Sequence, residues 1–144
     1  MATPGETAVG QSANMEDMMY KNNPYKHTSV TTASPGELIV MLYDGALKFT
    51  GYAVQAYGDG DAALAASSIA RAVAIINYLQ SVLDETQSPE LVGQLERLYM
   101  KWAHRLTKAN VSRDPEAVIE IRKEIEEMRE AWVEVNRQVS TSAA

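Results

Sequence analysis

Residues 32–49 have the sequence TASPGELIVMLYDGALKF, which carries the signals that begin a helix. Ser34 is a suitable N-cap, Pro35 suits the first helical position, and Glu37 completes a capping box. After Glu37, apolar side chains would point almost all the way round the helix, whereas one buried stripe needs far fewer. We therefore expect a second surface, in this chain or in a partner, to cover part of this helix.

Similar start signals recur along the chain and divide it into four helices. They are Asp61, Ser88 with Pro89, and Asp114 with Pro115. The predicted helices cover about residues 35–57, 61–83, 89–110 and 115–139. Because the connections are short, neighbouring helices should be antiparallel. The predicted fold is all-α, an antiparallel up-down-up-down four-helix bundle with a flexible N-terminal segment.

Apolar residues at steps of three and four give the predicted core. The first helix has the stripe Leu38, Leu42, Gly45, Phe49 and Ala53, and the second has Leu64, Ser68, Ile69, Ala72, Ile75, Ile76, Leu79 and Leu83. The third has Leu91, Leu95, Leu98, Trp102, Leu106 and Ala109, and the fourth has Val118, Ile121, Ile125, Met128, Trp132, Val135 and Val139. In the last two helices charged residues lie opposite the stripe, as is typical of a bundle facing water.

The chain should consist of a flexible tail over residues 1–23, the bundle over residues 24–139 and a frayed C-terminus over residues 140–144. The tail is rich in small and polar residues and has no sustained period. Residues 24–33 are a candidate lid, since Tyr25 and Val30 can fold back onto apolar surface at the high effective concentration of a tethered segment. For Val30 the alternative is that it only anchors the entry of the first helix.

Composition restricts the function classes. The chain has 144 residues, a net charge of −6 and a pI of about 4.9, which argues against binding to nucleic-acid phosphates or to an anionic membrane surface. The lack of cysteine excludes disulfides and Cys-based metal sites and fits a reducing cytosol. No apolar run reaches the roughly 18 residues that span a bilayer, and the N-terminus lacks the layout of a signal peptide. We expect a soluble cytoplasmic protein.

No pattern of catalytic or metal-binding residues is present. His27 and His104 are the only histidines, and His104 lacks the Glu-x-x-His spacing of di-iron bundles. The many glutamates of the fourth helix lie at ion-pair spacings on its polar face, which favours a solvated surface over paired catalytic carboxylates. There is no glycine-rich phosphate loop. The sequence therefore predicts neither an enzyme nor a bound cofactor or metal.

The first two helices have more apolar surface than their stripes require. In the first, Ile39, Tyr43 and Leu47 lie on a flank outside the stripe. In the second, Arg71 is the only charge between Asp61 and Leu83. The outer residues of the second helix include Ala66, Ala70, Val73, Ala74 and Tyr78. Three explanations remain open: alanines serving only as helix formers, a homodimer contact, or a groove for an amphipathic partner segment.

Four segments resemble a known family. NPYKHTSVTTASPGELIVMLYDGALKF (residues 23–49) resembles the signature of the flagellin-specific export chaperone family, FliS. The resemblance continues through RAVAIINYLQSVLD (71–84), LERLYMKWAHRLTKANVSRD (95–114) and EMREAWVEV (127–135). The sequence departs from the family in its longer tail before residue 23 and in Val73 and Ala74, where polar residues are common.

The resemblance implies a small cytosolic bundle that binds the disordered C-terminal segment of flagellin. Such binding would prevent premature polymerisation and deliver the subunit for export. The family's N-terminal segment, around the tyrosine matched by Tyr25, covers part of the binding site when flagellin is absent. Further partners would be an export-gate component or a co-chaperone. The alternative is a structural or self-associating helical-bundle adaptor without a flagellin client.

Overall fold

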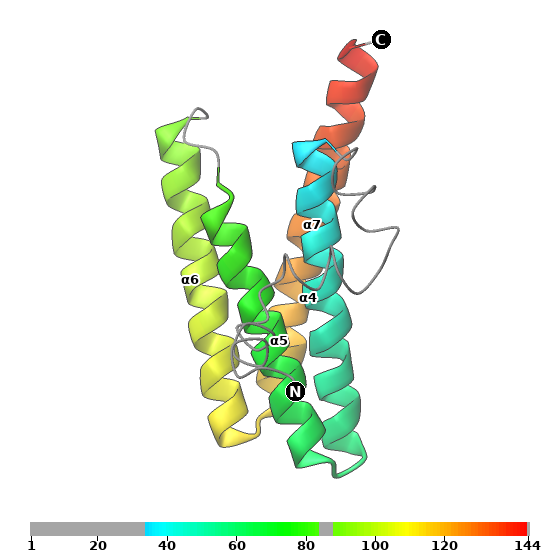
Figure 1. The fold of residues 1–144 in the computed structure, drawn as a ribbon, viewed down its shortest axis with the longest axis vertical. Helices are drawn as coiled ribbons and strands as arrows, with labels where there is room; N and C mark the ends of the chain where they lie inside the picture. Colours follow the sequence, from blue (N-terminus) through cyan, green and yellow to red (C-terminus); the bar gives the residue numbers. More distant parts are fainter. Residues whose placement is uncertain (1–33, 84–87, 144) are drawn as a thin grey trace, which may run out of the picture. The chain divides into compact units, whose positions relative to one another are not determined.

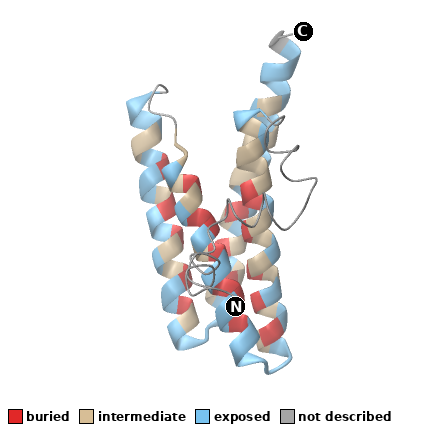
Figure 2. Ribbon diagram, viewed as in Figure 1, coloured by how far each residue is buried: buried red, intermediate tan, exposed pale blue. Residues whose placement is uncertain are grey.

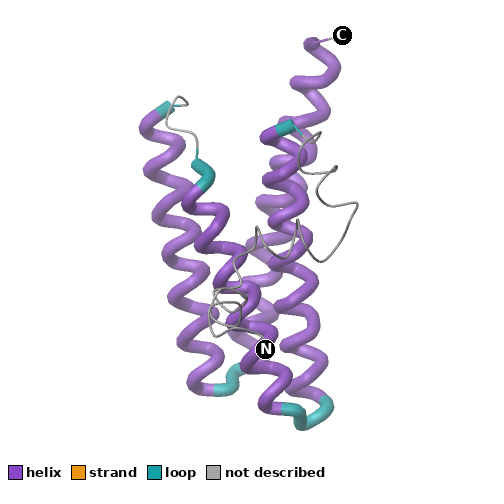
Figure 3. Tube along the Cα trace, viewed as in Figure 1, coloured by secondary structure: helices purple, strands orange, loops and turns teal. Residues whose placement is uncertain are grey.

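In a computed structural model of the chain, the structure describes residues 34–83 and 88–143. The chain divides into two units, Met1–Leu38 and Ile39–Ala144. The described residues form four helices: α4 (Pro35–Gly58), α5 (Ala62–Ser81), α6 (Pro89–Ser112) and α7 (Pro115–Ala143). Figure 3 shows that, within the described ranges, only short connections and helix ends are not helical. This confirms the predicted all-α class with four helices.

Successive helices of the second unit alternate in direction (Figure 1), which is compatible with the predicted up-down-up-down order. Three helix ends differ by two or more residues from the sequence prediction. Helix α6 ends at Ser112, two residues beyond the predicted end at Asn110. Helix α5 ends at Ser81, two residues before Leu83. Helix α7 continues to Ala143, through residues expected to fray. In its last turns, Arg137 pairs with Glu134, and the hydroxyl of Thr141 donates to the carbonyl oxygen of Arg137.

The helix starts follow the predicted capping. At the start of α4, the Ser34 N–H donates to Oε1 of Glu37 at 2.9 Å, and the Glu37 N–H donates to Oγ of Ser34 at 3.1 Å, as in a capping box. Three other caps accept from the backbone N–H three residues later: Asp61 from Leu64, Ser88 from Leu91, and Asp114 from Ala117. These bonds satisfy donors that a helix leaves free in its first turn.

The core is built mainly from the predicted stripes. The side chains of Ile69, Trp102, Leu106 and Ile121 are fully buried, so the prediction that Trp102 lies in the core is confirmed. Leu64, however, is 48% exposed because Ala65 takes the inward position in the first turn of α5. Seven of the twenty α5 residues are buried.

In the second unit, the buried residues do not extend to one end of the helices (Figure 2). No residue is buried in four ranges there: 39–41, 80–83, 88–94 and 126–141. We call these four ranges the half-buried end. Leu91, Val135 and Val139 belong to it and are 39%, 47% and 61% exposed, so their prediction as core residues is wrong. These residues lie on the apolar side of their helices, but at a height along the helix axis where the neighbouring helices no longer cover them.

Among the described helices, α5 alone has the length and apolar composition of a membrane span. Its apolar residues include Ile69, Ile75, Ile76 and Leu79, which are buried against the rest of the second unit. The core helix of a soluble bundle has the same composition, so this property is weak evidence for a membrane segment.

Candidate partner-binding surface

The side chain of Tyr43 lies in the core and not on an uncovered flank. It is completely buried, and its hydroxyl oxygen lies 3.0 Å from that of Tyr99 and accepts a hydrogen bond from Nε1 of Trp132 at 3.2 Å. Its ring packs edge-on against Trp102, with 6.0 Å between ring centroids. The surface position predicted for Tyr43 is therefore wrong. A buried hydroxyl needs such partners, and here they come from α6 and α7.

Burial raises the pKa of the Tyr43 and Tyr99 phenols above the usual value. The charged phenolate would lose its hydration in the core, so both groups stay protonated. They act here as neutral hydrogen-bonding groups that fix α4 against α6 and α7. The arrangement gives no reason to assign them to proton transfer.

Arg122 on α7 hydrogen-bonds to α4 next to Leu47. Its Nε donates to Oγ1 of Thr50 at 3.1 Å, and its Nη2 donates to the carbonyl oxygen of Leu47 at 3.2 Å. A Cβ on Gly51 would lie 3.3 Å from Nη2 of Arg122, so the glycine leaves room for the guanidinium. The side chain of Leu47 remains partly exposed, as does that of Ile39 in the half-buried end.

A carboxylate on α7 ties α6 to α7. Oε1 of Glu124 accepts from Nε1 of Trp102 at 3.0 Å, and Nη1 of Arg105 lies 2.8 Å from both carboxylate oxygens. Burial alone would raise the pKa of Glu124, but these hydrogen bonds and the charges of Arg105 and Lys101 lower it overall. The described residues contain no group of three or more potential metal ligands.

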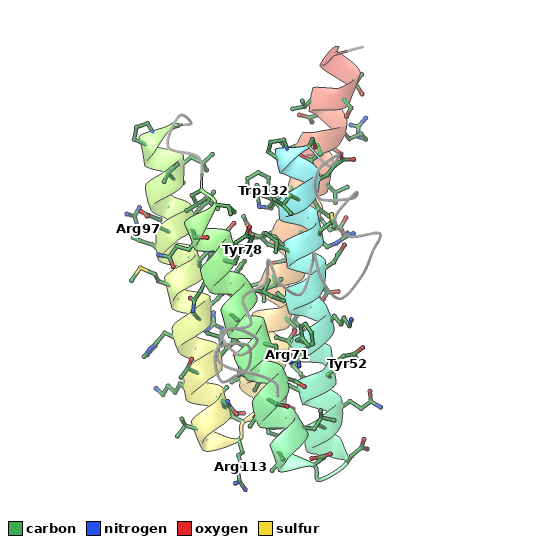
Figure 4. The ribbon with its side chains drawn as sticks, in the orientation of Figure 1. Tyr52, Arg71, Tyr78, Arg97, Arg113 and Trp132 are labelled. Atoms are coloured by element: carbon green, nitrogen blue, oxygen red, sulfur yellow. The ribbon has the colours of Figure 1, made fainter. Side chains whose placement is uncertain are left out.

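The predicted residues of α5 divide between two environments. Ala66, Ala70 and Ala74 are exposed at steps of four, so they lie along one side of the helix. We call these three residues the α5 outer face. Val73 and Tyr78 are partly buried instead. Figure 4 shows Tyr78 and Trp132 on the facing sides of their helices, which places Tyr78 close to the half-buried end.

The α5 outer face and the half-buried end are two separate apolar surfaces of the second unit. On α5 the small side chains would let another backbone approach closely. The half-buried end exposes larger side chains: Leu91, Trp132, Val135 and Val139, with Ile39 at the start of α4. The apolar stripes predict the first four of these for the core, and among the five only Ile39 is predicted for the site. Tyr25 and Val30, also predicted for the site, lie outside the described residues.

Comparison with known proteins places the chain in a family. Residues 17–139 match the family described as "Flagellar protein FliS". The chain is 34% identical over 108 residues to the flagellar secretion chaperone FliS of Bacillus subtilis, covering 75% of this chain and 80% of that protein. It is 32% identical over 114 residues to the FliS of Salmonella typhimurium, covering 78% and 84% of the two chains. The protein therefore belongs to the FliS family of flagellar secretion chaperones.

Proposed function

We propose that this protein is a cytoplasmic chaperone that binds the C-terminal segment of flagellin along the α5 outer face and the half-buried end. Binding would keep the flagellin subunit from polymerising before export. The carrying observation is the α5 outer face, which exposes Ala66, Ala70 and Ala74 on a helix whose only charge is Arg71. Such a face suits an apolar helix, because Arg71 is the only charged side chain of α5 that a docking helix could desolvate.

The half-buried end favours an extended contact with the client over binding in a single pocket. Trp132 and Leu91 keep part of their apolar surface in water, where a second segment of the client would cover it. A client that becomes ordered on binding loses conformational entropy, so it needs a large apolar area to bind stably. An area on the order of 1,500 Å² would suit this mode. None of these steps requires a catalytic group.

The proposal is tested by isothermal titration of the full chain with the C-terminal peptide of the cognate flagellin. Ala70→Glu places a carboxylate in the contact, and we expect at least a tenfold loss of affinity, about 1.4 kcal/mol, with unchanged circular dichroism. The control is Gln55→Glu, which adds the same charge at an exposed position on α4. Equal affinities of both variants and the parent protein would place the client elsewhere.

The α5 outer face also suits contact between two copies of this chain, since exposed alanines allow two helices to pack closely. Light scattering separates the two functions. A chaperone should be monomeric alone and form a one-to-one complex with flagellin. A self-associating adaptor should form a dimer that Ala70→Glu dissociates, and it should not bind the flagellin peptide.

A further inference from the structure

The solvent face of α6 carries a stripe of positive charge on a chain whose net charge is −6. The stripe consists of three cations, Arg97, Lys101 and Lys108, and of His104, which the net charge of −6 counts as neutral. The four residues follow each other at steps of four, three and four and are all exposed. Residues at these steps lie above one another on one side of a helix. We call these four residues the α6 basic stripe. The acidic residues of α6, Glu90 and Glu96, both precede it.

Most other arginines on or near α7 form ion pairs with carboxylates, but within the described ranges two cations of the stripe do not. Among the described residues, Arg105, Arg129 and Arg137 form ion pairs with carboxylates, whereas none is found for Arg97 or Lys108. Lys101 acts electrostatically on Glu124, at the border with α7. Figure 4 shows the side chain of Arg97 pointing away from the other helices. The positive charge of the stripe is thus largely uncompensated within the described part of the chain.

Two apolar side chains lie along one edge of this stripe. Met100 is 59% exposed and Val111 is 82% exposed, the largest exposure among the large hydrophobic side chains described. Both fall within about a quarter turn of the basic residues, at helical positions beside His104 and Lys108. An exposed apolar edge next to a row of cations matches one side of an amphipathic helix that carries carboxylates and apolar residues together.

We propose that the α6 basic stripe, with Met100 and Val111, docks an acidic amphipathic helix of another protein. This site is distinct from the α5 outer face and does not depend on the flagellin proposal. From Arg97 to Lys108 the stripe extends about 17 Å, three turns of helix. A partner with carboxylates at the same spacing would pair with Arg97, Lys101 and Lys108 and place one carboxylate beside His104. Its apolar residues would cover Met100 and Val111.

A peptide helix fits this surface better than a nucleic acid. A polyanion would contact the cations equally well but would leave Met100 and Val111 in water. It would also meet the field of a chain with net charge −6, which repels a long row of phosphates. A short helix with a few carboxylates meets less of that repulsion and uses the apolar edge as well.

The experiment uses the full chain and a fluorescent synthetic helical peptide with glutamates at steps of four, three and four and leucines along the adjoining edge. Fluorescence anisotropy should show binding that weakens with added salt. Arg97→Glu/Lys108→Glu should reduce the affinity at least tenfold. The control, Lys48→Glu/Lys123→Glu, changes the net charge equally at exposed positions of α4 and α7 and should reduce it less than threefold. Absence of binding, or equal loss in both variants, would overturn the proposal.

Two further arms separate this site from its alternatives. Met100→Ser/Val111→Ser changes no charge, and it should reduce the affinity for the peptide severalfold. If that variant binds the peptide normally and a single-stranded oligonucleotide binds the stripe more tightly than the peptide does, the surface is a polyanion site and the proposal is wrong. Titration of Arg97→Glu/Lys108→Glu with the flagellin peptide should give the parent affinity. A tenfold loss of affinity for the flagellin peptide would mean that flagellin itself binds the stripe. The proposal of a separate site would then be wrong.

Discussion

Removing the hydroxyl of Tyr43 should destabilise the bundle although it removes no apolar contact. In Tyr43→Phe, the Tyr99 hydroxyl loses the partner that lies 3.0 Å away and keeps only the Trp132 side chain, whose Nε1 loses its acceptor at 3.2 Å. Tyr99 is 1% exposed, so water cannot readily replace the lost partner. An unsatisfied buried polar group costs roughly 1–3 kcal/mol. Trp132 is only partly buried and should add little, so we expect a loss of about 2 kcal/mol.

Urea denaturation followed by circular dichroism measures this loss. With a slope of about 2 kcal/mol per molar urea, the midpoint should fall by about 1 M while the slope stays constant. Tyr52→Phe is the matched control, because that side chain is 46% exposed and no hydrogen bond of its hydroxyl is found among the described residues. The control should shift the free energy of unfolding by less than about 0.5 kcal/mol.

The double variant Tyr43→Phe/Tyr99→Phe makes the test sharper. It removes both hydroxyls of the pair, so no buried tyrosine oxygen is left without its partner, and its cost should be less than the sum of the two single variants. Strict additivity, or a Tyr43→Phe midpoint equal to that of Tyr52→Phe, would show that the two hydroxyls do not interact in the folded protein. A polar network between these hydroxyls would then not fix α4 in the core.

Three other predictions concern pH, the N-terminal segment and the half-buried end. Because burial raises the pKa of Tyr43 and Tyr99 in the folded state, stability should be fully present below the unfolded value near 10 and should fall as pH rises above it, which urea titrations at pH 9 and 11 would detect. Deleting residues 1–26 should raise the binding of a hydrophobic dye if residues 24–33 form a lid, whereas unchanged dye binding would argue against one. Val135→Asp should weaken the flagellin peptide severalfold but change the urea midpoint little, since Val135 is 47% exposed; a large fall in the midpoint would mean that the side chain belongs to the core.

The helix starts and most of the core could be predicted because both depend on local patterns. Ser34 and Glu37 form their capping box from residues three positions apart. On α6 the strict spacing of Leu95, Trp102 and Leu106 determines which side of the helix is apolar, and all three are buried. In each case the sequence alone contains the relevant geometry, since the period of a helix is fixed.

The errors arise where burial depends on distant elements. Tyr43 was predicted on the surface, yet its partners Tyr99 and Trp132 lie 56 and 89 positions away in the sequence. Leu91 and Val135 continue apolar stripes, but a stripe indicates a direction around the helix axis and not the level at which the neighbouring helices stop covering it. The exposure of Ala66, Ala70 and Ala74 agrees with the sequence analysis, while their role in binding a client stays a prediction.

The distribution of charge gives a physical reason why exposed apolar surface need not lead to aggregation. The α5 outer face is nearly free of charge, whereas the outer side of α7 carries Glu116, Glu120, Glu127, Glu130 and Glu134, all exposed. Two copies approaching through α5 would each carry a net charge of −6, and their repulsion opposes a weak apolar contact between them. A client segment with little net charge would not meet that repulsion. The same apolar face would therefore bind such a client in preference to a second copy, and added salt should reduce this preference by screening the charges.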